Sequence, residues 1–489
     1  MGGPLAAGAT RRRWVPVCFI LAAAAVAGIA LARGDGPSSA ASTEAPWFAY
    51  GRTPDAANVA ASPITVAQAK RFKLAWKSNL GGGMDAQPLF VPAGSVPGVH
   101  RDLVIAATTT NEVYALAAST GRIVWKQSLG ATVTNICKGT GGIESTPVVD
   151  PATGLLYAVG ANGRLRAFSV ATGKPDSKWN VQIISRTDVE TVWSGLRIAN
   201  GFIYVGVGSW CDTPDKAGAW DGRLDAVSVA TRRIAHTFDV VPGPINGGGI
   251  WGPGGVSIDP SDGSIWVATA NAVVESGGDL VEKAPHAERV LHLTPTLAIR
   301  SEVVQPDNNP SVIGDQGFGS TPLLFQPKGC PGLVGVNSKD SYTYVWRRSA
   351  LESKPVLRML LGQPGANNTF FAEPTWDASA NMLVVDDAQV RGGDGSNGAA
   401  GLTPGTRCTF RVAWHINIGG GVAPQPLAAG PVVFAPATAA GQLAALNART
   451  GAILALLGTD GAAYTAPMVA GGRVLVGSSS GALLAFGAG

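Results

Sequence analysis

The stretch that decides the fold is Val113-Tyr114-Ala115-Leu116-Ala117-Ala118-Ser119-Thr120-Gly121-Arg122-Ile123-Val124-Trp125. Apolar residues alternate through its first part, a Thr-Gly pair follows, and a short β-branched run ends in a tryptophan. Alternation with a period of two indicates a strand, and glycine supplies the positive φ that a tight turn needs. The stretch therefore predicts two antiparallel strands joined by a tight turn.

The same pattern returns along the chain. Clear copies lie in residues 165–179 and 443–456, and weaker ones lie in residues 224–232 and 290–295. Another pair of strands precedes each hairpin, and four strands per repeat are typical of a propeller blade. We expect blades near residues 88–128, 146–182, 196–240, 254–304, 320–361, 371–418 and 424–458.

The last repeat, residues 466–486, supplies only three strands. A strand that would complete it stands at the other end of the chain, in residues 72–77, and its Trp76 corresponds to Trp125. An eighth blade built from both termini removes the open sheet edges that an unclosed ring would expose. The sequence therefore predicts an all-β protein, with a single eight-bladed propeller of four-stranded blades in residues 47–489.

The N-terminus has a different character. Arg11, Arg12 and Arg13 precede an uncharged apolar run from Trp14 to Ala32. This predicts a signal peptide or a transmembrane anchor in residues 1–33, followed by a flexible linker of small residues in 34–46. Both alternatives stay open, and both place the propeller outside the cytoplasm, either secreted or anchored to the cell membrane.

Composition excludes several classes of protein. Hydrophobic residues make up 46% of the chain and charged residues 14%, which excludes a disordered chain or a coiled coil. Apart from the three N-terminal arginines, 34 of the 37 basic residues remain against 33 acidic ones, so no basic face is expected to bind nucleic acid. The five histidines are scattered, and no zinc motif or P-loop occurs.

Four cysteines lie outside the N-terminal apolar run: Cys137, Cys211, Cys330 and Cys408. An even number of cysteines in an exported chain predicts two disulfides. Three pairings are open. Cys137–Cys211 and Cys330–Cys408 are favoured, because each would join neighbouring or next-neighbouring blades.

The repeated Ala-Leu-x-x-x-Thr-Gly-x-x-x-Trp signature resembles the repeat of the pyrroloquinoline-quinone (PQQ) propeller superfamily. The resemblance implies that the tryptophan packs between neighbouring blades. Members of that superfamily range from quinoprotein dehydrogenases to envelope proteins that only bind partners. The resemblance to this superfamily implies a quinoprotein alcohol dehydrogenase that uses PQQ and calcium to oxidise a small-molecule alcohol. The alternative is a non-catalytic envelope propeller that binds protein or polymer partners.

Several segments are similar to the active site of PQQ alcohol dehydrogenases. By that resemblance, Trp251 stacks beneath the quinone and Asn271 ligates calcium. Asp315 takes the proton of the alcohol as the catalytic base. Lys339 lies against the quinone oxygens, where a cation would stabilise the charge of the reduced quinone.

The chain also departs from the dehydrogenase pattern. Those enzymes carry two adjacent cysteines over the cofactor, whereas Cys137 has no adjacent cysteine. Asp212 or Asp215 stands where a calcium-binding glutamate is expected, and either carboxylate is a suitable hard oxygen ligand. No C-x-x-C-H haem motif occurs, so electrons would have to leave to a separate acceptor.

Overall fold

The computed structural model describes residues 44–137, 139–211, 220–242, 246–273, 285–306, 317–361, 372–388, 398–421 and 424–489. The predicted signal or anchor segment and residues 34–43 of the predicted linker lie outside these residues. Within the described part of the chain, no helix is long and apolar enough to cross a membrane.

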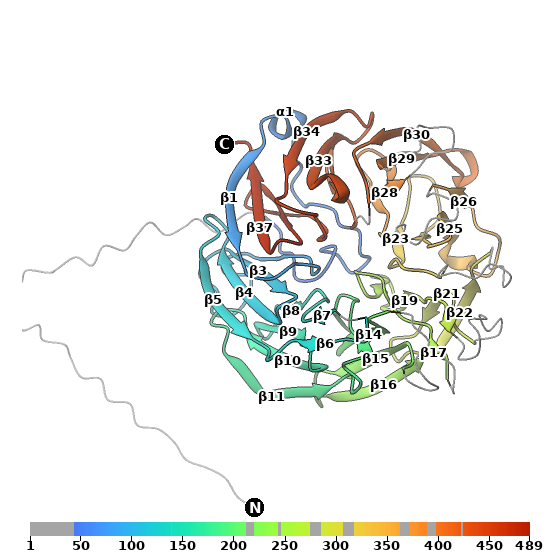
Figure 1. The fold of residues 1–489 in the computed structure, drawn as a ribbon. Helices are drawn as coiled ribbons and strands as arrows, with labels where there is room; N and C mark the ends of the chain where they lie inside the picture. Colours follow the sequence, from blue (N-terminus) through green and yellow to red (C-terminus); the bar gives the residue numbers. More distant parts are fainter. Residues whose placement is uncertain are drawn as a thin grey trace, which may run out of the picture. The chain divides into compact units, whose positions relative to one another are not determined.

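Eight antiparallel sheets surround a common axis, which confirms the predicted eight-bladed propeller (Figure 1). From inner to outer strand, the first four blades along the chain are β2 (Leu89–Val91), β3 (Leu103–Thr108), β4 (Glu112–Ala117) and β5 (Ile123–Ser128); β8 (Val148–Asp150), β9 (Leu155–Val159), β10 (Arg164–Ser169) and β11 (Pro175–Gln182); β13 (Arg197–Ala199), β14 (Phe202–Ser209), β15 (Arg223–Ser228) and β16 (Arg233–Asp239); and β18 (Ser257–Ile258), β19 (Ile265–Ala268), β21 (Arg289–Leu293) and β22 (Ile299–Val304).

The next three blades are β23 (Leu323–Phe325), β24 (Leu333–Asn337), β25 (Tyr342–Arg347) and β26 (Leu357–Leu360); β27 (Thr375–Asp377), β28 (Met382–Ala388), β29 (Gly398–Pro404) and β30 (Phe410–Asn417); and β31 (Leu427–Ala429), β32 (Val432–Ala437), β33 (Gln442–Asn447) and β34 (Ile453–Gly458). Short additional elements are the helix α1 (Val66–Ala69), the strand β12 (Glu190–Thr191) beside β14, and the two-stranded pairs β6 (Val133–Thr134) with β7 (Thr140–Gly141) and β17 (Asn246–Gly247) with β20 (Ala272–Val273).

The eighth blade contains both ends of the propeller, as predicted. Its inner strands are β35 (Met468–Ala470), β36 (Arg473–Gly477) and β37 (Ala482–Gly487), and its outer strand is β1 (Lys73–Asn79). β1 pairs antiparallel with β37, from Lys73 opposite Gly487 to Asn79 opposite Ala482. Backbone hydrogen bonds therefore hold the first strand of the ring to the last.

Tryptophans of the repeat join one blade to the next. The Trp76 indole donates to the Ala118 carbonyl oxygen at 3.0 Å, and Trp125 donates to Val170 in the same way at 2.9 Å. Each accepting carbonyl lies three residues before the glycine of the neighbouring hairpin turn, against which the ring packs. A Cβ built on Gly121 would lie 2.5 Å from the Trp76 ring. The turn glycine thus makes room for the tryptophan of the preceding blade, which confirms the packing that the repeat implied.

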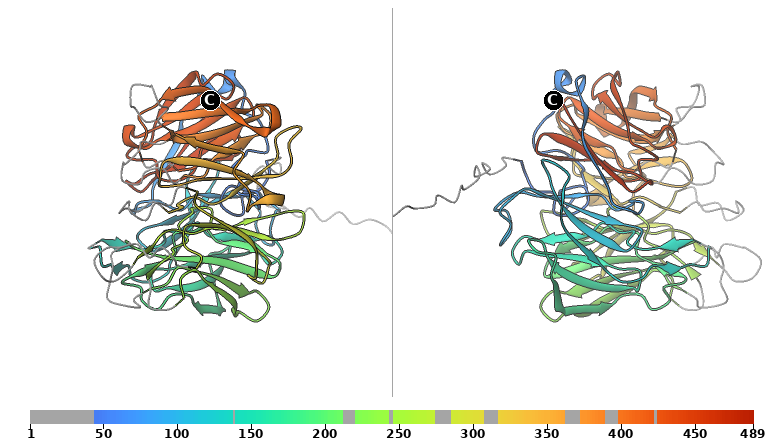
Figure 2. Two further views of the ribbon diagram at one scale, coloured as in Figure 1. Left: turned by 90° about the vertical axis from the view of Figure 1, so that its right-hand side faces the viewer. Right: turned by 60° about the vertical axis from the view of Figure 1, so that its left-hand side comes forward.

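The hydrophobic core lies between the faces of neighbouring blades. One cluster joins the seventh, eighth and first blades and contains Phe434, Met468, Trp76 and Tyr114. Further clusters fill the other interfaces. Side views show the twisted sheets packed face against face (Figure 2). Burial between sheets, rather than within one central core, therefore stabilises the ring.

Residues 47–64, which we call the axial segment, lie at the centre of the ring (Figure 1). Hydrogen bonds join this segment to all eight blades. The bonded pairs are Trp47–Phe90, Phe48–Val149, Thr53–Arg197, Pro54–Ile258, Asp55–Leu324, Tyr50–Glu373, Asn58–Ala428 and Asn58–Pro467. The segment therefore fills the space that the inner strands surround, and satisfies their backbone groups where no neighbouring strand does.

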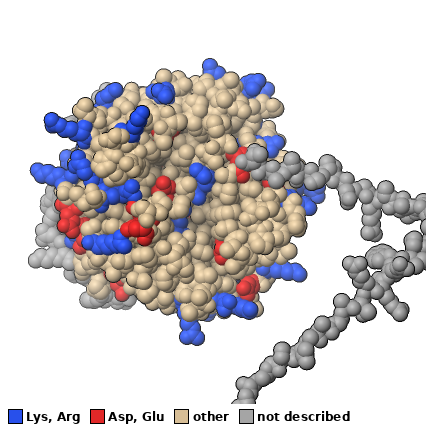
Figure 3. All heavy atoms as spheres, turned by 180° about the vertical axis from the view of Figure 1, so that it is seen from behind, with Lys and Arg blue, Asp and Glu red and all other residues tan. Residues whose placement is uncertain are grey.

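The two disulfides pair Cys137 with Cys211 and Cys330 with Cys408, which confirms the favoured pairing. The first links the connection between the first two blades to the end of β14, and the second links neighbouring blades. On the face seen from behind in Figure 3, described basic and acidic side chains are interspersed.

Candidate functional site

A cavity of about 450 Å³ lies at one end of the propeller axis, beside the axial segment. This volume is within the range of small-molecule sites. The lining residues are Tyr50, Asp85, Glu144, Trp193, Trp251, Pro253, Gly319, Lys339, Pro424, Tyr464 and Ala466. Aromatic rings, two carboxyl groups and one ammonium group therefore converge on one cavity. The carboxyl groups and the ammonium group come from different blades.

Six lining residues occupy the same position in their blades. Each stands four residues before the first residue of an inner strand, as Asp85 does before β2 and Glu144 before β8. The other four are Trp193, Pro253, Gly319 and Tyr464. Because inner strands begin at the same end of the axis in every blade, one repeat position supplies much of the cavity wall.

Glycines set the orientation of Trp251. A Cβ built on Gly208 of β14 would lie 3.5 Å from three carbons of the indole ring, and one built on Gly249 would lie 2.7 Å from Nε1. A side chain at Gly249 would therefore overlap the ring, whereas a Cβ at Gly208 would only touch its face. Trp251 also packs against Val189 and Trp220. These contacts hold its ring as part of the cavity wall.

The structure brings Trp251 and Lys339 together, as their predicted roles require. The Lys339 Nζ lies 5.6 Å from the centroid of the Trp251 ring and over it. The Lys339 backbone N–H donates to the Gly317 carbonyl oxygen at 3.2 Å, which anchors this turn beside the fourth blade. An ammonium group at the face of an indole is favourable, and Lys339 itself lines the cavity.

Asn271 is not among the residues that line the cavity. Its side chain is 4% exposed, and its Oδ1 has no hydrogen-bond donor among the described residues. A Cβ built on Gly317 would lie 2.4 Å from the Asn271 backbone nitrogen, so the two loops are in close contact. A buried amide oxygen without a donor is a suitable ligand for a hard cation.

Three predicted site residues, Asp212, Asp215 and Asp315, lie outside the described residues. Their roles stay predictions. Within the described ranges, no group of three or more His, Cys, Asp or Glu side chains is arranged to hold a metal ion.

A carboxyl pair, Asp85 and Glu144, forms another part of the wall. Glu144 is 6% exposed, and its Oε1 accepts the Gly142 N–H at 3.0 Å. Burial, followed by the hydrogen bond to Asp85 and its negative charge, raises the pKa of Glu144 to about 9. At neutral pH Glu144 therefore keeps its proton and donates it in a hydrogen bond to Asp85.

Sequence reasoning missed Asp85, Glu144, Tyr50 and Trp193. For Asp85 and Glu144 a signal existed, because both precede the x-x-Pro that starts a blade: Asp85-Ala86-Gln87-Pro88 and Glu144-Ser145-Thr146-Pro147. Aligning these starts across the repeats would have placed both carboxyl groups at one end of the axis.

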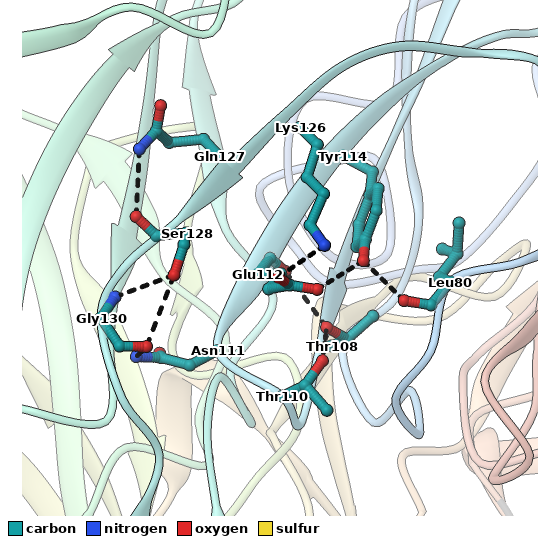
Figure 4. Close-up of polar contacts among 10 residues, drawn as sticks. All are labelled: Leu80, Thr108, Thr110, Asn111, Glu112, Tyr114, Lys126, Gln127, Ser128 and Gly130. Carbon is teal, nitrogen blue, oxygen red and sulfur yellow. Dashed lines mark hydrogen bonds and ion pairs between the residues drawn. The ribbon is translucent and has the colours of Figure 1, made fainter.

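A second polar cluster lies on the outer part of the first blade and does not reach the cavity (Figure 4). The Lys126 Nζ lies 2.6 Å from the Glu112 Oε1. The Tyr114 hydroxyl lies 2.5 Å from Glu112 Oε2 and 2.6 Å from the Leu80 carbonyl oxygen, and its single proton is donated to one of the two. Partial burial alone would raise the pKa of Glu112, but the hydrogen bonds from Lys126 and Tyr114 outweigh it and lower this pKa.

The repeat is also recognised by comparison with known families. The model of the PQQ-repeat family described as "Outer membrane protein assembly factor BamB" matches residues 60–236 and 394–488, together more than half of the chain. The chain belongs to this family. Both matched ranges end in propeller blades, and the second includes the blade that closes the ring.

Two curated proteins that are similar to this chain, an assembly factor and a dehydrogenase, differ in what their names describe. The outer membrane protein assembly factor BamB of Moranella endobia is 31% identical over 165 residues, which cover 33% of this chain and 37% of the relative. A polyvinylalcohol dehydrogenase of a Pseudomonas species is 24% identical over 271 residues, which cover 51% of this chain and 40% of the relative. The matches thus span about two fifths of the length of each relative.

Solved structures share the fold of this family member at low identity. A quinohemoprotein alcohol dehydrogenase from Pseudomonas putida HK5 superposes with a TM-score of 0.68 at 15% identity, covering 91% of this chain and 80% of that one. BamB from Moraxella catarrhalis superposes with a TM-score of 0.55 at 13% identity, covering 85% of this chain and 97% of that one. The chain is therefore a PQQ-repeat propeller that shares its fold with both of these structures.

Proposed function

We propose that the cavity binds a planar quinone cofactor of the PQQ type, and that the protein oxidises an alcohol outside the cytoplasm. The observation that carries the proposal is the Lys339 ammonium group over the Trp251 ring, 5.6 Å from its centroid, in the wall of the axial cavity. The two residues come from different blades and were predicted from separate motifs. The similarity to a polyvinylalcohol dehydrogenase over 51% of the chain supports the same reaction class.

The described residues fit such a cofactor. The flat Trp251 ring offers a stacking surface, and the cavity has room for a tricyclic molecule. Lys339 offers a positive charge to anionic oxygens. Glu144, which keeps its proton, carries no negative charge that would repel a carboxylate of the cofactor. The Asn271 Oδ1 is the open acceptor that would hold calcium, together with Asp212 or Asp215.

When bound, a quinone supplies the acceptor for the two electrons of alcohol oxidation. The protein must orient the alcohol and accept its hydroxyl proton. Asp315 is the residue we propose for this step, from its position in the sequence motif. Of the two described carboxyl groups that line the cavity, Asp85 could take the same role, because Glu144 already holds its own proton.

The test is PQQ binding by equilibrium dialysis with and without calcium, followed by dye-linked alcohol oxidation. We expect the wild type to bind PQQ at or below micromolar concentration. Trp251→Leu removes the stacking surface and Lys339→Gln removes the charge, and each should weaken binding at least about tenfold.

Lys126→Gln is the matched control, because Lys126 also lies over an aromatic ring, 5.3 Å from the Tyr114 centroid, but outside the cavity. It should leave PQQ binding unchanged. A wild-type protein that binds no PQQ at micromolar concentration would exclude the dehydrogenase.

A partner-binding propeller is the second candidate. Two observations favour it: the matching family model carries the BamB description, and Cys137 pairs with the distant Cys211 instead of an adjacent cysteine. Such a protein would keep its function in cells when Trp251→Leu and Lys339→Gln are introduced, whereas the dehydrogenase needs both residues. The two disulfides support an extracytoplasmic location for either candidate.

A further inference from the structure

We infer that Tyr50 of the axial segment closes the inner end of the cavity, and that it sets the size of the aromatic ligand that the cavity admits. The inference rests on the proposed function, in which this cavity is the ligand site. It concerns a residue that lies outside the repeats and outside the motifs that resemble those of the dehydrogenases.

The Tyr50 side chain is fixed between two blades. It is 1% exposed and lines the cavity. A Cβ built on Gly195 would lie 3.3 Å from the Tyr50 Cβ, and one built on Gly254 would lie 3.1 Å from its Cδ1. The glycine backbone before β13 thus packs against the Tyr50 Cβ, and the glycine backbone before β18 packs against the edge of its ring. A side chain at either glycine would crowd Tyr50.

The Tyr50 hydroxyl also connects the axial segment to the loop that carries Trp251. It donates to the Glu373 Oε2 at 3.0 Å, and Glu373 Oε1 accepts the Gly254 N–H at 2.9 Å. Burial, and then the negative charge of Glu373, raise the pKa of Tyr50, so the hydroxyl keeps the proton that it donates. Gly254 follows Pro253, which lines the cavity only two residues after Trp251.

These contacts give Tyr50 two separable roles. Its ring occupies the inner end of the cavity, and its hydroxyl positions the Trp251 loop through Glu373. Removing the ring should therefore lengthen the cavity at its inner end. Removing the hydroxyl alone should leave the length unchanged, because the same glycine backbones still hold a phenyl ring.

The test uses two flat anions of different length, naphthalene-2-sulfonate and pyrene-1-sulfonate, whose sulfonate suits Lys339 and whose rings suit Trp251. Binding is measured from probe fluorescence for the wild type, Tyr50→Phe and Tyr50→Ala. We expect the wild type to prefer the naphthalene probe by at least about tenfold, and Tyr50→Ala to lose that preference. Tyr50→Phe should keep it.

Tyr464→Ala is the matched control. Tyr464 lines the same cavity but is 40% exposed, at the outer side, so its removal should leave the preference for the smaller probe intact. Thermal unfolding monitored by circular dichroism identifies the variants that fold. If Tyr50→Ala does not fold, Tyr50→Leu, which keeps an apolar side chain but no ring, replaces it.

A folded Tyr50→Ala or Tyr50→Leu protein with the wild-type preference would overturn the inference, whatever the protein does with PQQ. Conversely, a wild type that discriminates between the two sulfonates through Tyr50 but binds no PQQ would overturn the proposed function alone. The two failures are therefore distinguishable.

Discussion

The contact between Trp76 and Gly121 joins the blade that closes the ring to the first blade, and Gly121→Ala tests it. Gly121 has φ of +70°, where an L-residue costs about 1–2 kcal/mol relative to glycine. The new Cβ would also lie 2.5 Å from the Trp76 ring and 2.5 Å from the Ser78 Oγ. Forcing such an overlap costs about 1–3 kcal/mol. Gly121→Ala should therefore lower the free energy of unfolding by about 2–5 kcal/mol.

Gly94→Ala is the matched control, because Gly94 has a similar φ of +76° and no atom within 4 Å of the new Cβ. It should cost only the backbone term of about 1–2 kcal/mol. Urea denaturation of both variants measures the difference. In a Trp76→Ala background the overlap with the ring is absent and only the overlap with the Ser78 Oγ remains, so Gly121→Ala should cost less than it does in the wild-type background. Equal destabilisation of the two glycine variants in the wild-type background would refute the reasoning.

Three further predictions concern charges and disulfides. Because the pKa of Glu144 is raised to about 9, the unfolded chain loses this proton at lower pH than the folded one. Wild-type stability should thus fall between about pH 4.5 and 9, and in thermal melts at a series of pH values Glu144→Gln should remove that part of the slope. For Glu112 the sign is opposite: its lowered pKa stabilises the fold above the unfolded pKa, and this is lost as the pH falls through the folded one. Glu112→Gln should cost at most about 1 kcal/mol at pH 7 and less as the pH falls through the lowered pKa of Glu112, and an effect that does not change with pH would contradict the ion pair. Replacing Cys330 and Cys408 by serine opens a loop with a sequence separation of 78 and should cost up to about 4 kcal/mol in urea denaturation. A thiol titration of the denatured, unreduced wild type should find none of the four cysteines Cys137, Cys211, Cys330 and Cys408 free.

The sequence predicted the repeats well, because each blade carries its own local signal. The Thr-Gly turn and the following tryptophan marked the hairpins, and the strand around Trp76 identified the blade that both termini share. Trp251 and Lys339 were predicted from separate motifs, and the ring of blades brings them together. Such local patterns can be recognised in a sequence because each of them depends only on the residues of one turn or one strand.

Tyr50 could not be predicted in this way. It lies in no repeat, and only the path of the axial segment through the ring brings it to the cavity. Asp85 and Glu144 stand at equivalent positions in two blades, but their pairing depends on how neighbouring inner strands converge. The raised pKa of Glu144 arises from that convergence and from burial, which no local pattern contains.

The axial segment also has a consequence for the order in which the chain folds. Residues 47–64 leave the ribosome before any blade, yet their hydrogen-bond partners extend to Pro467 in the last one. A nascent chain therefore has to keep its first segments unplaced while more than 400 residues follow, and contacts of such long range form slowly. The axial segment, which is synthesised before the blades, is thus the part whose contacts are completed last. A chain released before its last blade lacks some of the partners that hold this segment.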